Sequence, residues 1–275
     1  MAIALGIDFE DITHTPAYRG LADPGETSVD LVALTGDLLD LFDRFGVTVT
    51  FFIVAEFAET HPEAVQRIAA HGHEIASHTL SHRSLVGLDS ETRAEELGRS
   101  KEILEEITGN RVWGIRAPTC QIDDSVYRSL VSEGYEYSSS VMPSLPIPGF
   151  YSNEYAFSDA TKVSTGAGDV MEIPLTVHPI LRLPLSGAWI RILGRTYAHQ
   201  GIRSVLGSGA DVVTYSHPWE FTDLWETPLP FRNRIRTGHW ITETYESILD
   251  LDAEFCTVAD LVDRTNPARE YLLTP

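Results

Sequence analysis

Cysteine is scarce in this sequence, and long hydrophobic runs are absent. The chain of 275 residues has only two cysteines, Cys120 and Cys256, which lie far apart in sequence. Two distant cysteines do not build the disulfide framework of a small secreted domain, so we expect both thiols to be buried in the core. Since no apolar run is long enough to cross a bilayer, we also expect no membrane span.

Basic side chains are half as numerous as acidic ones. The sequence has 20 Lys and Arg residues against 40 Asp and Glu residues, which gives a net charge of −20. Because a surface of this charge repels polyanions, we expect neither nucleic acid nor an anionic membrane surface as a partner. The acidic composition favours solubility, and it is also typical of proteins adapted to high salt, so a halophilic protein is one interpretation.

The sequence also begins without the basic region and the extended apolar region of a secretory signal. Its first residues enter a short apolar run at residues 3–7, which predicts a buried strand. We therefore expect no signal peptide and a cytoplasmic location. The hydrophobic content of 43% suffices for a large core, and the length is typical of one α/β barrel or two small domains.

Apolar runs that suit strands alternate with amphipathic segments that suit helices. Residues 28–45, for example, place leucine and phenylalanine at helical spacing before Gly46, and residues 47–54 form a β-branched and aromatic run. This alternation predicts βα units around a parallel sheet. Residues 142–168 are rich in Pro, Ser and Tyr and lack a clear period, so we expect a loop-rich insertion there within a single domain of residues 1–275.

Two histidines follow the strand expected at residues 74–77. His78 and His82 are four residues apart, a spacing that puts both imidazoles on one side of a helical turn or a tight loop. Two imidazoles placed in this way can bind one cation, and neutral imidazole suits zinc best among the common biological metals. A histidine pair alone is a weak signal, so the hypothesis of a metal site needs support from other residues.

That support comes from polar side chains that follow other expected strands, namely Asp8, Glu10, Asp11, Arg116 and His217. The carboxyl ends of the strands form the ligand-binding face of a parallel α/β barrel. Two histidines and one carboxylate are the ligand set of a catalytic zinc site, and such a metal polarises a carbonyl and acidifies water. A second carboxylate can accept the proton of the water while a separate histidine protonates the leaving group. These residues together predict an amide hydrolase.

The motifs resemble those of the polysaccharide deacetylases, which are also called carbohydrate esterase family 4 or the NodB homology domain. The resemblance covers roughly residues 3–262 and is carried by residues 50–53, 72–75 and 78–82, by Arg116-Ala117-Pro118 and by Ser216-His217-Pro218. It implies a distorted (β/α)7-type barrel, the NodB homology fold. It also implies an Asp-His-His site for a divalent metal, most simply Zn²⁺, and a carbohydrate substrate, because the family removes acetyl groups from N-acetylated sugars.

The resemblance implies roles for individual residues. His78 and His82 match the metal-binding histidines of the family, and Arg116 matches the arginine that orients the catalytic base. His217 matches the general acid that protonates the departing amine. We also expect Pro118, which follows the arginine motif, and Trp219, whose ring can pack on a pyranose, to contact the substrate.

The first motif departs from the Thr-Phe-Asp-Asp of the family. Alignment on Phe9 makes Glu10 the base and Asp11 the metal ligand, whereas alignment on the apolar strand makes Asp8 the base and either Glu10 or Asp11 the ligand. The Asp-x-acid form resembles the branch with peptidoglycan deacetylases and allantoinase-like enzymes, in which the first Asp is the base, so we favour Asp8. Relatives in this branch carry an Asp near Ser138 that this sequence lacks.

Two other functions are alternatives to sugar deacetylation. One is hydrolysis of a cyclic amide or imide by an allantoinase-like enzyme with the same fold and a small substrate. The other is carbohydrate binding by a barrel that has lost catalysis. The complete set of acids, paired histidines, arginine and late histidine argues against the second alternative.

Overall fold

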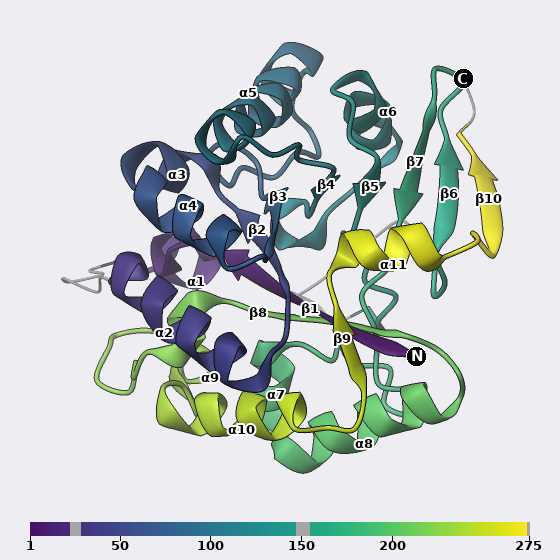
Figure 1. Ribbon diagram of the computed structural model, residues 1–275. Coiled ribbons are helices and arrows are strands. Elements are labelled where there is room, and N and C mark those ends of the chain that lie inside the picture. Colours follow the sequence, from purple (N-terminus) through teal and green to yellow (C-terminus); the bar gives the residue numbers. More distant parts are fainter. Residues whose placement is uncertain (23–28, 147–154, 274–275) are drawn as a thin grey trace.

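A computed structural model describes residues 1–22, 29–146 and 155–273, which form a curved sheet with helices around it (Figure 1). The central strand β1 (Ala2–Phe9) is buried along its whole length. It lies between β2 (Thr50–Ile53) and β8 (Val212–Ser216), and all three strands run parallel. Its nearly continuous apolar sequence fits this position, because a parallel strand covered on both faces has no polar side.

The strand order in the sheet is β10-β6-β7-β5-β4-β3-β2-β1-β8, and β9 also pairs with β1. The remaining strands are β3 (Glu74–Ser77), β4 (Gly114–Ile115), β5 (Tyr137–Ser138), β6 (Thr161–Ser164), β7 (Asp169–Glu172), β9 (Glu254–Cys256) and β10 (Arg269–Leu272). After β7 the backbone N–H of Thr176 donates to the carbonyl of Val213 in β8 (2.9 Å). The chain thereby brings the two sides of the curved sheet together, and the expected distorted barrel is confirmed.

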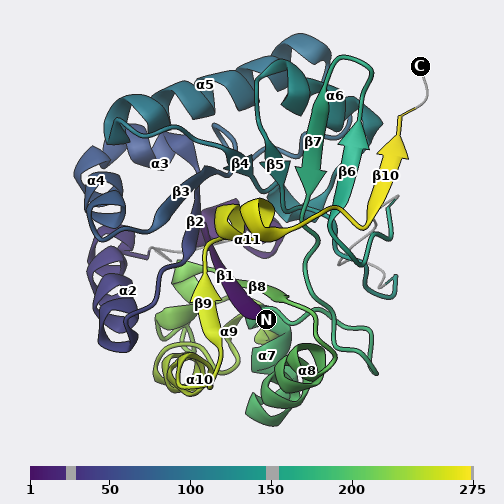
Figure 2. The same ribbon diagram turned by 45° about the vertical axis from the view of Figure 1, so that its right-hand side comes forward.

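Helices surround the strands (Figure 2). They are α1 (Pro16–Arg19), α2 (Leu31–Phe45), α3 (Ala55–Thr60), α4 (Pro62–Ala70), α5 (Ser90–Thr108), α6 (Asp124–Ser132), α7 (Gly187–Leu193), α8 (Arg195–Gly207), α9 (Phe231–Arg234), α10 (His239–Leu249) and α11 (Val258–Arg264), with short 3₁₀ turns η1 (Ile12–His14), η2 (Pro118–Cys120) and η3 (Pro218–Phe221). None of the helices within the described ranges has the length and apolar character needed to cross a bilayer.

Helix α11 covers the amino-terminal end of the barrel (Figure 2). The backbone N–H of Val258 donates to the hydroxyl of Thr50 (2.8 Å), and the N–H of Ala259 donates to the carboxylate of Glu74 (3.1 Å). Thr50 and Glu74 are the first residues of β2 and β3. Because this end is covered, the carboxyl ends of the strands are the end that can receive a ligand.

Several elements differ from the sequence expectation. The segment near residues 190–206, whose sequence pattern predicts one helix, forms two helices, because Gly194 with a φ of 97° interrupts the chain between α7 and α8. The segment 142–168, expected to be a loop-rich insertion, contains strand β6, which pairs antiparallel with β7. Part of that segment, residues 147–154, lies outside the described residues.

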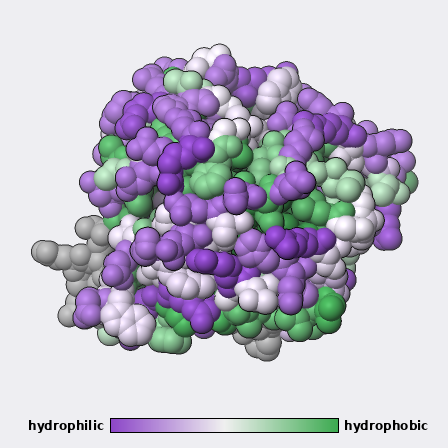
Figure 3. Space-filling model, turned by 60° about the horizontal axis from the view of Figure 1, so that its bottom comes forward, coloured by the Kyte–Doolittle hydropathy of each residue, from purple (hydrophilic) through white to green (hydrophobic). Residues whose placement is uncertain are grey.

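On the face seen in Figure 3, hydrophilic residues surround smaller hydrophobic areas, as the acidic composition suggests.

Candidate active site

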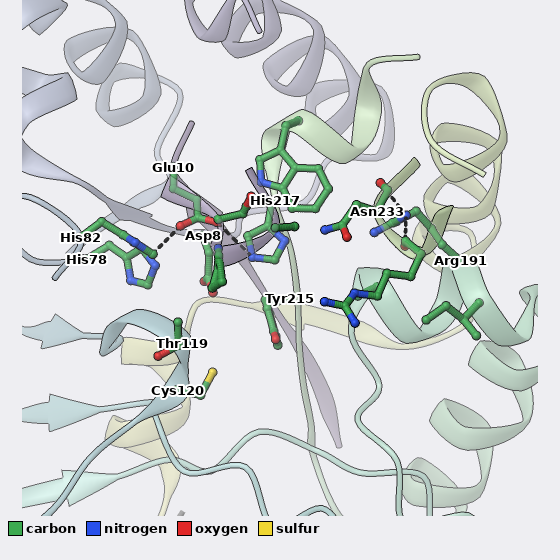
Figure 4. A pocket seen from close by; sticks show the side chains of 17 residues that line it. Asp8, Glu10, His78, His82, Thr119, Cys120, Arg191, Tyr215, His217 and Asn233 are labelled. Carbon is green, nitrogen blue, oxygen red and sulfur yellow. Dashed lines mark hydrogen bonds and ion pairs between the residues drawn. The ribbon is translucent and has the colours of Figure 1, made fainter. Parts of the chain in front are cut away.

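Three buried side chains meet at the carboxyl ends of neighbouring strands. Glu10 follows β1, and His78 and His82 follow β3, so that one potential ligand atom from each lies within 4.8 Å of the others (Figure 4). One strand, β2, separates β1 from β3, and side chains beyond the ends of such strands point into the same space. These are the only residues of the described parts of the chain that form such a group of possible metal ligands.

The two imidazoles are held in defined orientations. The Nδ1–H of His78 donates to the carbonyl of Arg116 (2.7 Å), which leaves Nε2 as the atom available to a metal. His82 reaches the same space through a tight loop in which Thr79 and His82 have positive φ values of 70° and 57°. This backbone is sparsely populated by non-glycine residues, and Glu96 supports it by accepting the N–H of Ser81 (3.0 Å).

The carboxylate of Glu10 has the environment of a metal ligand. Its Oε2 is buried close to Nε2 of His82, but no group donates a hydrogen bond of normal geometry to it. Its Oε1 lies 3.6 Å from Nε2 of His217. Burial raises the pKa of Glu10, but the charge of His82 and of the other imidazoles outweighs burial and holds this pKa well below its usual range. A buried, ionised carboxylate beside two imidazoles is a donor set that fits a divalent metal of the zinc type.

Asp11, the other candidate ligand, does not join this cluster. Its carboxylate accepts the backbone N–H of Thr13 (2.8 Å) and thereby caps the 3₁₀ turn η1. Because β1 ends at Phe9 and Asp11 caps the turn that begins at Ile12, Asp8 and Glu10 line the pocket while Asp11 faces the turn. Of the two acids that the sequence analysis left open as the metal ligand, Glu10 and not Asp11 lies with the two histidines. His14, which follows this turn, stacks on His82 with ring centroids 5.2 Å apart.

Asp8 and Arg116 form a buried ion pair beside the cluster. Nη1 of Arg116 donates to Oδ1 of Asp8 (2.6 Å), and neither side chain is more than 4% exposed. The guanidinium also donates to the carbonyl and the hydroxyl of Ser139 (2.8 and 3.0 Å) and lies 4.0 Å from the ring centroid of Phe52. A Cβ at Gly6 would lie only 2.5 Å from Nη1, so the glycine makes room for this arginine. Arg116 thus fixes the orientation of Asp8.

His217 has a buried partner, Glu220, that the sequence analysis missed, and Glu220 is in turn bound by Arg191. The Nδ1–H of His217 donates to Oε1 of Glu220 (2.7 Å), and Oε2 of Glu220 accepts a hydrogen bond from Nε of Arg191 (2.8 Å). Burial lowers the pKa of His217, but the hydrogen bond to Glu220 and the charge of Glu10 raise it, and the resulting pKa lies above its usual range. The sequence lacks the aspartate that relatives carry near Ser138, and Glu220 provides a carboxylate partner for His217 instead. The sequence signal that could have identified this contact is the acid at position 220, three residues after His217 in a short turn.

These groups line one pocket of about 190 Å³. Trp219 lines it as well and stacks on His217, with ring centroids 4.8 Å apart. Pro118 is not part of the lining: it is buried behind Thr119 and Cys120, whose side chains line the pocket in its place. Burial raises the pKa of the Cys120 thiol to about 12, so this cysteine is not a nucleophile at neutral pH.

The carboxylate–histidine cluster at the carboxyl end of the barrel is therefore a candidate metal site. Residues 23–138 match the model of the polysaccharide deacetylase family, and residues 139–263 match the model of a domain of unknown function, DUF3473. This match to the polysaccharide deacetylases covers less than half of the chain. The boundary between the two matches falls beside β5 within the continuous sheet. The second match contributes His217 and Arg191 to the pocket lining, and it contains Glu220, which binds both.

Among curated proteins, the chain is similar to a peptidoglycan deacetylase of Helicobacter pylori, with 27% identity over 146 residues. That match covers 51% of this chain and 49% of the relative. The chain therefore spans about half the length of this relative, and it spans about a third of a fungal peptidoglycan deacetylase-like protein of Gibberella zeae, at 34% identity.

A solved structure of similar fold belongs to a protein described as a polysaccharide deacetylase, from Mycobacterium smegmatis. It has a TM-score of 0.68 and 21% identity, over 100% of this chain and 93% of the other. A family 4 pseudoenzyme from Bacillus anthracis has a TM-score of 0.56 at 12% identity, over 99% of this chain and 69% of the other. These likenesses show the fold alone, so the argument for activity rests on the residues of the pocket.

Proposed function

We propose that this chain is a metal-dependent hydrolase that removes the acetyl group from an N-acetylated sugar of a polysaccharide or glycan precursor. One observation carries the proposal: the cluster of Glu10, His78 and His82 shares a pocket with the Arg116-bound Asp8 and with His217. The match of residues 23–138 to the polysaccharide deacetylase model supports the reaction class.

Glu10, His78 and His82 would hold the metal, and their donor set favours Zn²⁺. When bound there, a divalent metal supplies a Lewis acid that polarises the acetyl carbonyl and lowers the pKa of water. The tautomer of His78 suits this task, since its Nδ1–H is already engaged by the carbonyl of Arg116. Metal analysis of the purified protein by mass spectrometry tests both the presence of the ion and its identity.

Asp8 is the general base in this proposal. Arg116 holds one carboxylate oxygen of Asp8, and the residue lines the pocket, so the carboxylate can accept a proton from the attacking water. The oxygen of that water forms the new bond to the acetyl carbon. Thr119, in the loop after Arg116, lines the same pocket, and we place the backbone N–H that stabilises the developing oxyanion in this loop.

His217 is the general acid. Its Nδ1–H is held by Glu220, so Nε2 is the atom that can donate a proton to the nitrogen of the departing amine. The carbon–nitrogen bond then breaks and yields acetate and the free amino sugar. Arg191 neutralises Glu220, because its guanidinium binds the same carboxylate within the protein interior.

The other two functions receive less support. Relatives with names such as peptidoglycan deacetylase and chitooligosaccharide deacetylase favour a sugar substrate over a cyclic amide. A non-catalytic protein would not need the paired Asp8–Arg116 and His217–Glu220 contacts beside a complete set of metal ligands.

The expectations of a cytoplasmic location and of adaptation to salt stay predictions, which cell fractionation and activity at several salt concentrations would test.

Acetate release from a panel of N-acetylated sugars and oligosaccharides is the experiment that tests the proposed function. We expect release that a chelator abolishes and added Zn²⁺ restores. A folded, metal-loaded protein that releases no acetate from any of these sugars would overturn the proposal. Allantoin and hydantoins in the same panel would then reveal the cyclic amide hydrolase.

A further inference from the structure

Glu172 is a buried acid that takes no part in the proposed mechanism. It is the last residue of β7, its side chain is completely buried, and it does not line the catalytic pocket. Burial raises the pKa of Glu172, although hydrogen bonds from neighbouring groups oppose this shift. Because a buried carboxylate costs folding free energy unless its contacts compensate, the partners of Glu172 indicate what it does.

The carboxylate binds the chain segment that follows β5. Its Oε1 accepts the backbone N–H groups of Ser140 and Val141 (2.8 Å each), and its Oε2 accepts the hydroxyl of Tyr127 in α6 (3.0 Å). All three partners are buried. Two consecutive N–H groups on one oxygen fix the backbone of residues 139–141, because rotation of either peptide would leave a buried donor unpaired.

The pairing of β7 with β5 does not itself need this carboxylate. The backbone N–H groups of Met171 and Ile173 donate to the carbonyls of residues 136 and 138 (2.9 and 2.8 Å), so the strands are joined through their main chains. The side chain of Glu172 acts one step further along, on a segment whose N–H groups point away from the strand ladder. Its contribution is therefore to the position of that segment.

The segment after β5 in turn carries Arg116. The carbonyl of Ser139 accepts a hydrogen bond from Nε of Arg116 (2.8 Å), and the hydroxyl of Ser139 accepts one from Nη2 (3.0 Å). The hydroxyl of Ser140 accepts the N–H of Ala117, the next residue after the arginine (2.9 Å). Nη1 then donates to Oδ1 of Asp8 (2.6 Å). The acid at the end of β7 is thus connected to the proposed base through buried contacts.

We propose that Glu172 is a positioning residue for the general base: it fixes residues 139–141, so that Arg116 holds Asp8 in the orientation that accepts a proton. This proposal rests on the proposed function and adds to it a residue that touches neither the substrate nor the clustered metal ligands. A displacement of about 1 Å at a reacting group can lower turnover by about 10²-fold, so a contact remote from the pocket can control the rate.

Glu172→Met tests the proposal, because it removes both acceptor oxygens and keeps a side chain of similar length. We expect kcat for an N-acetylated sugar to fall roughly 10²-fold while KM stays within about twofold. Metal content and the circular dichroism spectrum should match the wild type. Glu172→Gln keeps one oxygen for the two N–H groups and should recover most of the activity. A folded Glu172→Met with the kcat of the wild type would overturn the proposal.

Glu172→Asp provides the same test if the methionine variant does not fold. It keeps the charge but moves the oxygens by one methylene away from the N–H groups of Ser140 and Val141. Its kcat should also fall, by a smaller factor, with KM unchanged. A kcat equal to that of the wild type would again overturn the proposal.

A double-mutant cycle with Asp8→Asn separates positioning of the base from a general loosening of the fold. If Glu172 acts through Asp8, adding Glu172→Met to Asp8→Asn should cause little further loss of turnover. Single-turnover kinetics at high enzyme concentration measures the residual rates. A further loss of roughly tenfold or more in the double variant would show that Glu172 acts independently of the base, and would overturn the proposal.

The matched control is Glu74→Met. Glu74 also accepts a tyrosine hydroxyl, that of Tyr137 (2.7 Å), and a backbone N–H, that of Ala259 (3.1 Å), but it lies at the amino-terminal end of the barrel. This substitution should lower the thermal stability but leave kcat unchanged. An equal loss of kcat in Glu74→Met and Glu172→Met would mean that the loss of any such acid lowers turnover, which contradicts a specific role for Glu172.

The Nε–H of Arg116 gives a readout that does not depend on acetate release. Its NMR signal can be identified by its proximity to the ring of Phe52, and its exchange with solvent should be slow in the wild type and in Glu74→Met. Exchange should be faster in Glu172→Met. Unchanged exchange in that variant would overturn the proposal even where activity is lost. Faster exchange in a protein that releases no acetate would support the link from Glu172 to Arg116 and would count against the proposed function alone.

Discussion

Nδ1 of His217 lies 2.7 Å from Oε1 of Glu220, three residues further along the chain, and the second oxygen of this carboxylate lies 2.8 Å from Nε of Arg191. All three side chains come from the part of the chain that matches a domain of unknown function. A Cβ at Gly187 would lie only 2.3 Å from the carboxylate, so this glycine leaves the space that Glu220 fills. The contact explains how His217, the proposed general acid, is oriented without an aspartate near Ser138.

The first prediction concerns Glu220→Gln. The neutral amide no longer stabilises the protonated His217, so kcat for an N-acetylated sugar should fall by about 10²-fold while KM changes little. Turnover of p-nitrophenyl acetate should fall much less, because its leaving group departs without a proton. Steady-state kinetics on both substrates gives the comparison.

Glu220→Asp is the conservative control for that prediction, because it keeps the charge and should recover part of the amide activity. A variant whose amide and ester activities fall together, with unchanged metal content, would show that Glu220 only maintains the local structure. Equal kcat values for Glu220→Gln and the wild type would remove Glu220 from the mechanism altogether.

The second prediction concerns Asp8→Asn. If Asp8 is the base, this substitution should reduce kcat by 10² to 10⁴-fold, since a positioned base contributes about that factor. The metal content should stay at the wild-type level, because Asp8 is not among the three clustered ligands. Activity assays and metal analysis on one preparation provide the check, and loss of metal from Asp8→Asn would instead make Asp8 a ligand.

Sequence patterning predicts the long elements well because their signals are local. Helix α2 ends at Phe45 as expected, since Gly46, with a φ of 63°, ends it. The alternation of strands and helices likewise predicts the barrel, and with it the collection of His78, His82 and His217 at one end.

The remaining features depend on information that the sequence pattern does not contain. The choice between Glu10 and Asp11 depends on the residue at which β1 ends, and a shift by one residue reverses the direction of the side chain. Arg191 and Glu220 are 29 residues apart and meet only because α7 packs beside η3. Helix α9 has four residues, too few for a period to be recognised.

The third prediction concerns the pH dependence of stability. Burial lowers the pKa of His73 to about 4 in the folded protein, against an unfolded value of about 6.5. Between these values the unfolded chain binds more protons, so the contribution of His73 is fully present above pH 6.5 and is lost as the pH falls toward 4. Urea unfolding should show this loss in the wild type but not in His73→Gln.

Glutamine is the matched replacement because its side-chain oxygen can still accept the N–H of Val49, which His73 Nδ1 accepts at 3.3 Å. The difference in unfolding free energy between the wild type and His73→Gln should therefore change by about 2–3 kcal/mol from pH 7.5 to pH 4.5. A difference that stays constant over this range would mean that His73 titrates normally in the folded state.

The last prediction separates the two adjacent acids after β1. Glu10→Ala removes a buried carboxylate that lies among the clustered imidazoles, so this variant should lose bound metal and activity together, as His82→Ala should. Asp11→Ala removes only the cap of η1, which costs about 1 kcal/mol of stability, and should keep its metal. His217→Ala should also keep its metal while losing turnover, because His217 donates a proton and is not one of the ligands. Metal analysis after dialysis, paired with acetate release, distinguishes these cases. Metal retained in Glu10→Ala but lost from Asp11→Ala would return the ligand assignment to Asp11.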